Sequence, residues 1–202
     1  MHLPLILASN SPRRKELLTQ AGIAFEVVPS LYEEHNHPGI PPAQLVKEQA
    51  LGKALEVAHR YPERTILGAD TLVVLDQSIL GKPKDAQEAH AMLTEIQGRW
   101  HEVYTGIALV YGKDSSAQKT HVQITKVHLR ALSPQESTDY IATQEPMDKA
   151  GAYAIQGYGA LFVDAIEGCY TNVVGLSLPK LWDLLEPLGW RPFKPQNSLK
   201  ES

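Results

Sequence analysis

Ten polar side chains stand where an apolar pattern of this chain breaks off, and their types favour one kind of chemistry. They are Ser9, Arg13, Arg14, Glu34, Lys53, Asp70, Lys82, Asp148, Lys149 and Gln156. Phosphoryl chemistry needs such a set, because cations and a divalent metal held by carboxylates neutralise the charge that develops on phosphate oxygens. Taken singly, each residue also fits a surface ion pair or a helix cap, so only their joint placement favours this chemistry.

The N-terminal segment predicts a strand that leads directly into a helix. The apolar run Leu3–Ala8 has strand length, Ser11 is a good N-cap, and Pro12 suits the first helical position. Gly22 is placed to end the helix. The free N–H groups and partial positive charge of a helix N-terminus attract phosphate, and two serines and three cations surround this one. The alternative is an ordinary strand–helix turn with solvated Arg and Lys.

Two further chemical candidates interrupt apolar patterns. A helix is predicted from Pro42 to about His59, with an inward stripe of Val46, Ala50, Ala54 and Val57. Lys53 falls inside this stripe, so it either snorkels past the edge of the core or reaches into a cleft. Asp70 interrupts a later apolar run, and we expect it at the end of a buried strand or at a kink between two. A carboxylate there can activate water or hold Mg²⁺.

The remaining pattern is mixed α and β and predicts one fold. Further strands are expected at Ala24–Val28, Trp100–Tyr111, Lys119–Leu132 and Ala160–Ile166, and further helices after Asp85, from Ser133 to about Thr143, and at Leu178–Leu188. We therefore expect an α/β fold over residues 1–190, with a mixed central β-sheet flanked by helices and two lobes around a cleft. The tail, residues 191–202, is expected to be flexible.

Composition excludes several classes of partner. The net charge of −4 gives no general attraction to nucleic acid or to an anionic membrane. No apolar run approaches the roughly 18 residues of a membrane span, and the N-terminus lacks a signal-peptide pattern. The single Cys169 excludes an intrachain disulfide. These features are typical of a cytoplasmic protein.

Taken together, the motifs resemble the Maf-type nucleotide pyrophosphatases. The matching segments run in family order over roughly residues 5 to 185. They are Leu7-Ala8-Ser9-Asn10-Ser11-Pro12-Arg13-Arg14, Glu33-Glu34, Lys53-Ala54, Gly68-Ala69-Asp70-Thr71, Gly81-Lys82-Pro83, Asp148-Lys149-Ala150-Gly151-Ala152-Tyr153, Ile155-Gln156-Gly157 and Val174-Gly175-Leu176.

This resemblance implies hydrolysis of a nucleoside triphosphate between its α and β phosphates, with Mg²⁺ or Mn²⁺, on a fold like that of the inosine triphosphate pyrophosphatases. By position, Asp70 resembles the catalytic base and Glu34 its partner in holding the metal. The triphosphate-binding positions match Ser9, Arg14, Lys53 and Lys82. The resemblance also implies a homodimer.

The choice of base depends on three positions. The branch of the family that resembles dTTP/UTP pyrophosphatases carries the residue types found here at Arg13, Thr71 and Gln156. The 7-methyl-GTP branch has an aromatic residue, a different polar residue and an acid, which suit a cationic base. We therefore expect dTTP and UTP as substrates. The alternatives are 7-methyl-GTP or another modified purine, or a nucleotide-sensing regulator of septation that binds without hydrolysis.

Overall fold

The computed structural model describes residues 3–34, 39–111 and 117–191. Within these ranges the chain forms a seven-stranded sheet in the order β2-β1-β3-β5-β6-β7, with β4 paired to β3. β1 pairs in parallel with β2 and β3, and the other pairs are antiparallel. The mixed central sheet predicted from the sequence is thereby confirmed. Of the tail predicted to be flexible, residues 192–202 lie outside the described ranges.

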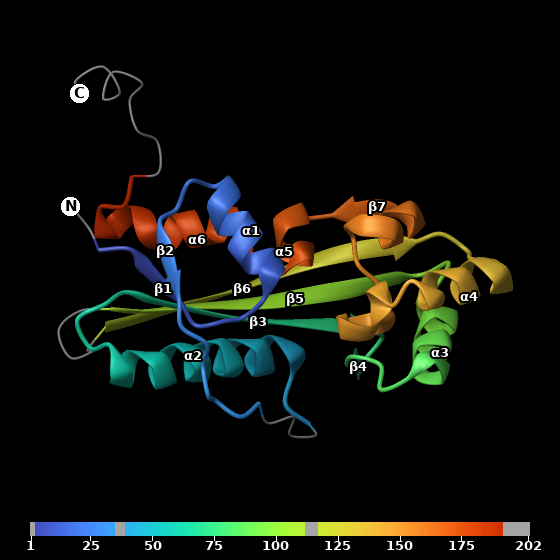
Figure 1. Cartoon of the computed structure of the whole chain (residues 1–202), viewed down its shortest axis with the longest axis horizontal. Coiled ribbons are helices and arrows are strands. Elements are labelled where there is room, and N and C mark those ends of the chain that lie inside the picture. Colours follow the sequence, from blue (N-terminus) through green and yellow to red (C-terminus); the bar gives the residue numbers. More distant parts are fainter. Residues whose placement is uncertain (1–2, 35–38, 112–116, 192–202) are drawn as a thin grey trace, which may run out of the picture.

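Three long strands form the spine of the sheet (Figure 1). The strands are β1 (Leu5–Leu7), β2 (Phe25–Val27), β3 (Ile66–Leu75), β4 (Ser78–Leu80), β5 (Trp100–Tyr111), β6 (Ala117–Leu129) and β7 (Val163–Glu167). The helices are α1 (Pro12–Gln20), α2 (Pro42–Arg60), α3 (Ala86–Ile96), α4 (Pro134–Ala142), α5 (Tyr170–Val174) and α6 (Leu178–Leu185). Short 3₁₀ turns are η2 (Glu145–Asp148), η3 (Ala150–Ala152), η4 (Gly157–Phe162) and η5 (Glu186–Leu188).

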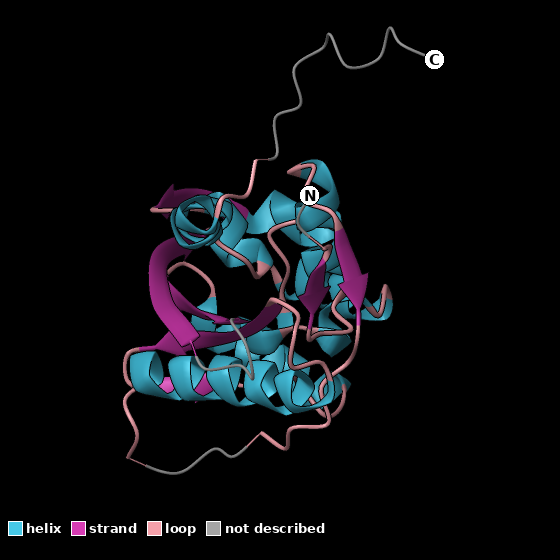
Figure 2. Cartoon of the chain, turned by 90° about the vertical axis from the view of Figure 1, so that its left-hand side faces the viewer, coloured by secondary structure: helices cyan, strands magenta, loops and turns pink. Residues whose placement is uncertain are grey.

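Helices cover both faces of the sheet. In Figure 1, α2 lies along one face of β3 and β5, while α1, α5 and α6 lie on the other. Figure 2 shows how strongly the strands curve between these two layers.

No helix within the described ranges combines the length and the apolar character that a bilayer span requires.

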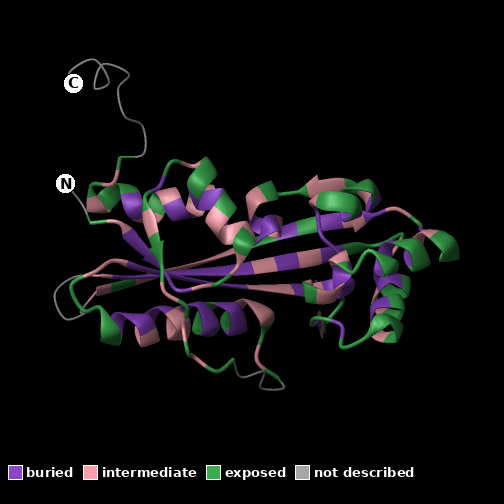
Figure 3. Ribbon diagram, in the orientation of Figure 1, coloured by how far each residue is buried: buried purple, intermediate pink, exposed green. Residues whose placement is uncertain are grey.

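The buried side chains gather in three clusters that define the two expected lobes. One cluster joins α3, α4 and η3 to the far ends of β5 and β6. The other two join α1, α5 and α6, and separately α2, to the end of the sheet near β1. Figure 3 shows the inward stripe of α2 and the central strands as buried. The long strands run through both lobes, so groups from either lobe can be held at fixed positions along one strand.

The predicted helix starts are confirmed by their caps. Ser11 accepts a hydrogen bond from the backbone N–H of Arg14 at 3.5 Å, and Asp85 accepts from the N–H of Glu88 at 2.8 Å. Ser133 and Glu136 form a complete capping box. Side chains that satisfy otherwise unpaired N–H groups thus fix where these helices begin.

Helix α2 packs unusually close to the sheet because two strand residues facing it are glycines. A Cβ added at Gly68 would collide with the carbonyl oxygen of Ala50, and one added at Gly106 with that of Val46. Gly68 and Gly106 lie in β3 and β5, which pair side by side. The absence of both side chains lets the helix backbone approach, which is a recurrent reason for glycine within a strand.

Two predictions of local structure were wrong, and two short elements were missed. Asp70 lies inside one continuous strand, β3, rather than at a strand end or a kink, because Gly68 is extended and serves packing instead of a break. Strand β4 and helix α5 were not predicted. The segment expected to begin a strand at Ala160 first completes η4. These elements are three to six residues long, too short for periodicity to show.

The close approach of α2 predicts a large effect of one methyl group. Gly106→Ala should lower the free energy of unfolding by about 3 kcal/mol, because the colliding atoms are backbone and cannot move aside cheaply. Urea denaturation monitored by circular dichroism measures this. Gly81→Ala is the matched control, since nothing lies within 4 Å of its added Cβ, and it should stay within about 1 kcal/mol of the wild type. Equal stabilities of the two variants would show that α2 does not depend on this contact.

Candidate active site

A pocket opens along an edge of β3 that its neighbours leave uncovered. On this edge β1 pairs with Ile66 and Leu67, and β4 pairs only from Val73 onward. The stretch between them pairs with β5 on the opposite edge alone, as far as the described residues show. We call the cavity there the β3 pocket. Its charged lining residues are Arg13, Arg14, Glu34, Lys53, Asp70, Lys82, Asp148 and Lys149.

An ammonium between two carboxylates forms the first part of the pocket. Lys53 Nζ lies 2.7 Å from Asp70 Oδ1 and 2.6 Å from Glu34 Oε1. Asp70 is buried, with 6% of its surface exposed, whereas the Glu34 side chain is 57% exposed. Of the two interpretations that the sequence left open for Lys53, the structure therefore shows the second: its side chain crosses the apolar stripe and reaches into a cleft.

Asp70 keeps one oxygen without a protein partner. Oδ1 accepts from Lys53, but Oδ2 is buried and has no hydrogen-bond partner in the described chain. A buried carboxylate oxygen in this state is costly unless water, a metal ion or a ligand satisfies it. Oδ2 is therefore the atom of this site that is available to accept a proton or a metal.

The loop carrying Glu34 is anchored to α2 at two points. Glu56 accepts hydrogen bonds from the Leu31 N–H at 2.9 Å and from the Ser30 hydroxyl at 3.0 Å. Gly52, the residue before Lys53 on α2, leaves room for the Tyr32 ring, which any side chain there would strike. Glycine has low helix propensity, so its presence before Lys53 is explained by this contact.

The pKa of Glu34 is lowered by its neighbours. Burial raises this pKa, but the hydrogen bond from Lys53 and the charges of Lys53, Lys82 and Arg14 outweigh it. Glu34 is therefore ionised at neutral pH. A carboxylate in this state can ligate a metal.

Arg14 forms the second part of the pocket. Its Nη1 donates to the Ser9 hydroxyl at 3.0 Å, its Nη2 to the Thr71 hydroxyl at 3.2 Å, and its Nε to the Gly175 carbonyl at 3.0 Å. Ser9 also accepts from the Ser11 N–H at 3.2 Å. These contacts fix the guanidinium beside the N-terminus of α1, where an anion is favoured.

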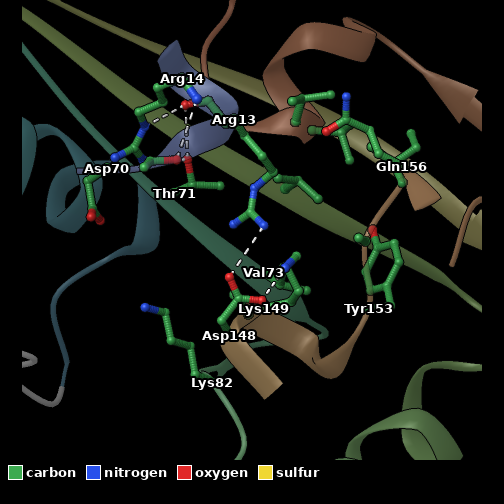
Figure 4. A pocket seen from close by; sticks show the side chains of 18 of the residues that line it. Arg13, Arg14, Asp70, Thr71, Val73, Lys82, Asp148, Lys149, Tyr153 and Gln156 are labelled. Atoms are coloured by element: carbon green, nitrogen blue, oxygen red, sulfur yellow. Dashed lines mark hydrogen bonds and ion pairs between the residues drawn. The ribbon is translucent and has the colours of Figure 1, made fainter. Parts of the chain in front are cut away.

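The opposite end of the pocket carries Tyr153 and Gln156 (Figure 4). The hydroxyl of Tyr153 forms a hydrogen bond with Nε2 of the buried His101, at 2.6 Å. Burial lowers the pKa of His101 to about 4, so the ring is neutral at physiological pH. The hydroxyl of Tyr153 is thus occupied, and its ring lines the pocket.

Between the two ends, Arg13 of α1 faces Asp148 of η2 across the pocket at 3.9 Å. Asp148 also pairs with Lys149. Burial raises the pKa of Asp148, but Lys149 and Arg13 outweigh burial and lower it. The N-terminal segment and the η2–η3 segment, far apart in sequence, therefore meet here through charges.

Most residues predicted for the site converge in this pocket. Ten of them line it: Arg13, Arg14, Glu34, Lys53, Asp70, Thr71, Lys82, Asp148, Lys149 and Gln156. Ser9 lies behind Arg14 and contacts it directly. Sequence reasoning gave no role to Tyr153, although it lies in a motif used for the resemblance, and it missed Thr105 and Asn172, which no local pattern marks.

The carboxylates of Glu34 and Asp70 fit a divalent metal. They already converge on one cation, the ammonium of Lys53, and Asp70 Oδ2 is unsatisfied. The described ranges contain no group of three or more His, Cys, Asp or Glu side chains that could form a complete metal cage. Mg²⁺ is commonly held by one or two carboxylates together with substrate phosphates and water, so two suffice.

Comparisons with known proteins show what this chain is similar to in sequence. A family model described as "Maf-like protein" matches residues 4–188. A dTTP/UTP pyrophosphatase of Gloeobacter violaceus is 54% identical over 193 residues, which cover 96% of this chain and 100% of that one. A dTTP/UTP pyrophosphatase of Acetivibrio thermocellus is 48% identical and covers 92% of this chain and 95% of its own. A solved HAM1 protein of Coxiella burnetii gives a TM-score of 0.44 at 15% identity, over 67% of this chain and 90% of that chain, too distant to bear on function.

The contact of Glu34 with Lys53 predicts a shift in titration. In the wild type the Glu34 carboxyl should titrate below its ordinary value of 4.5, so the stability it contributes is present above that pH and is lost as pH falls through the lowered pKa. Lys53→Met should raise this pKa, because burial is then opposed by fewer charges. Carbon-13 NMR of the carboxyl measures both values. Lys47→Met, an exposed lysine on the same helix, should leave the pKa unchanged; an unchanged pKa in Lys53→Met would refute the contact.

Proposed function

This chain belongs to the Maf-like protein family, and from that premise we propose that it hydrolyses dTTP and UTP to the nucleoside monophosphate and pyrophosphate. The proposal takes its substrates from relatives that carry the name dTTP/UTP pyrophosphatase. The observation that carries it is the contact of Lys53 with both Asp70 and Glu34 in a pocket lined by further cations. A triphosphate needs this combination of positive charge and a base.

Asp70 is proposed as the general base. Its Oδ2 has no protein partner and can accept the proton of a water molecule that attacks the α–β phosphoanhydride. The P–O bond of the anhydride breaks as the new P–O bond forms, and pyrophosphate leaves. Lys53, donating to Oδ1, holds the carboxylate in this orientation.

The cations are proposed to hold the triphosphate. Arg14 and Ser9 sit at the N-terminus of α1, and Lys53 and Lys82 enter the same pocket from α2 and from the loop before α3. Glu34 and Asp70 would hold a divalent metal, Mg²⁺ or Mn²⁺, which when bound neutralises charge on phosphate oxygens. Negative charge that grows during the reaction is thus met by groups already in place.

Arg13, Thr71 and Gln156 are proposed to select the base: Gln156 lies at the end opposite Arg14, Arg13 lies between the two ends, and Thr71 contacts Arg14. The amide of Gln156 can pair with the alternating acceptors and N3–H of a pyrimidine, and Tyr153 offers a flat apolar surface beside it. A cationic 7-methylguanine would meet Arg13 there, which disfavours it by like charge. The 7-methyl-GTP pyrophosphatase and the septation regulator remain as alternative functions.

The proposed enzyme has one domain, a cytoplasmic location and a small-molecule partner. Residues 1–190 would form one catalytic domain, acting in the cytoplasm on a free nucleotide. Neither nucleic acid nor a membrane would be its partner, and a homodimer is the expected assembly. These statements rest on the sequence and on family membership.

A substrate panel tests the proposal. With Mg²⁺ present, purified protein should release pyrophosphate from dTTP and UTP with kcat/KM at least about tenfold above that for 7-methyl-GTP, dATP and dGTP, since like charge or missing hydrogen bonds cost at least 1.4 kcal/mol. Coupled pyrophosphate assays with phosphorus-31 NMR identify the products. A best rate with 7-methyl-GTP would select the alternative substrate, and binding without turnover of any triphosphate would select the regulator.

Two neighbouring lysines supply the control. Lys82 lines the pocket, whereas Lys84, two positions later, is exposed and does not. Lys82→Met should raise KM for dTTP at least about tenfold, in line with loss of a charge-assisted hydrogen bond. Lys84→Met should match the wild type. Equal rates for the two variants would place the activity outside this pocket.

A further inference from the structure

Arg14 is held by three protein acceptors that come from distant parts of the chain. Ser9, Thr71 and the Gly175 carbonyl take one hydrogen bond each from Nη1, Nη2 and Nε. A guanidinium has five N–H donors, so two remain, one on each Nη. The protein contacts thus orient the fork and leave it two donors for a ligand.

The Thr71 partner is itself part of a longer series of hydrogen bonds. Its hydroxyl lies 3.0 Å from the Thr105 hydroxyl, which donates to the backbone carbonyl of Asn172 at 3.1 Å. Arginine can only donate and a carbonyl can only accept, so the two hydroxyls between them must point the same way. Arg14 therefore donates a hydrogen bond to Thr71, Thr71 donates to Thr105, and Thr105 donates to the Asn172 carbonyl.

A competing orientation satisfies fewer groups. Thr71 could instead donate to the Gly175 carbonyl, but that distance is 3.5 Å and the carbonyl already accepts from Arg14 at 3.0 Å. Only the direction toward Thr105 keeps all three bonds of the series at 3.2 Å or less. We call Thr71, Thr105 and the Asn172 carbonyl the hydroxyl file.

The end of the file is fixed by the side chain of Asn172. Its Nδ2 donates to the Val103 carbonyl and to the Thr125 hydroxyl, both at 3.0 Å, and the residue is fully buried. These bonds tie α5 to β5 and β6. Three residues further on, Gly175 adopts a φ of +130° that suits glycine, and its carbonyl meets Arg14. Helix α5 and its C-cap residue thus supply the Asn172 carbonyl, which accepts from Thr105, and the Gly175 carbonyl, which accepts from Arg14.

The Thr105 side chain does not contact the pocket itself. It is 0% exposed and does not line the β3 pocket, whereas Thr71 and Arg14 do. A cation at one end of a series of hydrogen bonds polarises the whole series. The Thr105 hydroxyl therefore reaches the pocket through Thr71, which contacts Arg14.

We propose that the hydroxyl file sets the orientation of Arg14 toward the triphosphate, which makes Thr105 and Asn172 positioning residues of this enzyme. The inference rests on the proposed function, since it names how one phosphate-binding cation of that site is held. It also gives Thr71 a role through Arg14, because its single proton is already committed to Thr105.

Thr105→Val tests the proposal, because it keeps the shape of the residue and deletes the hydroxyl. In kinetics with dTTP, kcat/KM should fall between about threefold and about tenfold, the range expected for one hydrogen bond. Thr105→Ser should restore it. In an Arg14→Lys background, where the guanidinium fork is absent, Thr105→Val should change kcat/KM less than about twofold.

Ser177→Ala is the matched control. Ser177 is also fully buried beside α5, but its hydroxyl contacts Cys169 and is outside the file. This variant should lose stability without changing kcat/KM. Independent effects of Thr105→Val and Arg14→Lys, which multiply, would overturn the proposal, and so would an equal loss of kcat/KM in Ser177→Ala.

Calorimetry with inorganic tripolyphosphate separates this proposal from the proposed function. Thr105→Val should weaken tripolyphosphate binding by a similar factor, and again only when Arg14 is present. If no nucleotide is hydrolysed but this coupling is found, the proposed function fails and the hydroxyl file stands. If dTTP is hydrolysed and the coupling is absent in both assays, the file fails alone.

Discussion

The close contact of α2 with the sheet is the constraint on which the site depends. Gly68 and Gly106 allow the helix backbone to lie against β3 and β5, where any Cβ would collide with it. From a helix held this close to the sheet, the ammonium of Lys53 contacts both Asp70 and Glu34. The same face of β3 that receives the helix carries Asp70, two residues after Gly68. The helix contact and the candidate catalytic carboxylate therefore lie on one strand, and a small change in the packing of α2 would displace the charged groups of the site.

The charges that line the β3 pocket match a polyanion. The whole chain has a net charge of −4, yet five cations and three carboxylates line the β3 pocket. Two of those carboxylates face Lys53 and one faces Arg13, so the cations are partly neutralised while no substrate is present. A triphosphate with its metal would exchange these internal pairs for phosphate contacts. Such a pocket remains stable when empty and still favours an anion.

Local patterns in the sequence predicted the helix starts and most residues of the pocket. They could not predict the hydrogen bonds between residues far apart in the chain. Ser11 and Ser133 marked helix starts because capping is a short-range hydrogen bond. Lys53 stood out because it broke an apolar stripe. Asp70 was misplaced since Gly68 looks like a strand break unless the helix above it is known. The Thr71–Thr105 and Thr105–Asn172 bonds span 34 and 67 positions, and no spacing rule connects such residues.

The role of Asp70 is the central claim, and single-turnover hydrolysis of dTTP by Asp70→Asn tests it most directly. The amide keeps the size of the side chain but cannot accept the proton of the attacking water. The account predicts a rate constant for the chemical step lower by about 100-fold to 10,000-fold, with dTTP still bound and the fold intact by circular dichroism. A variant that hydrolyses dTTP within about tenfold of the wild-type rate would contradict the account, since general-base catalysis contributes more than that.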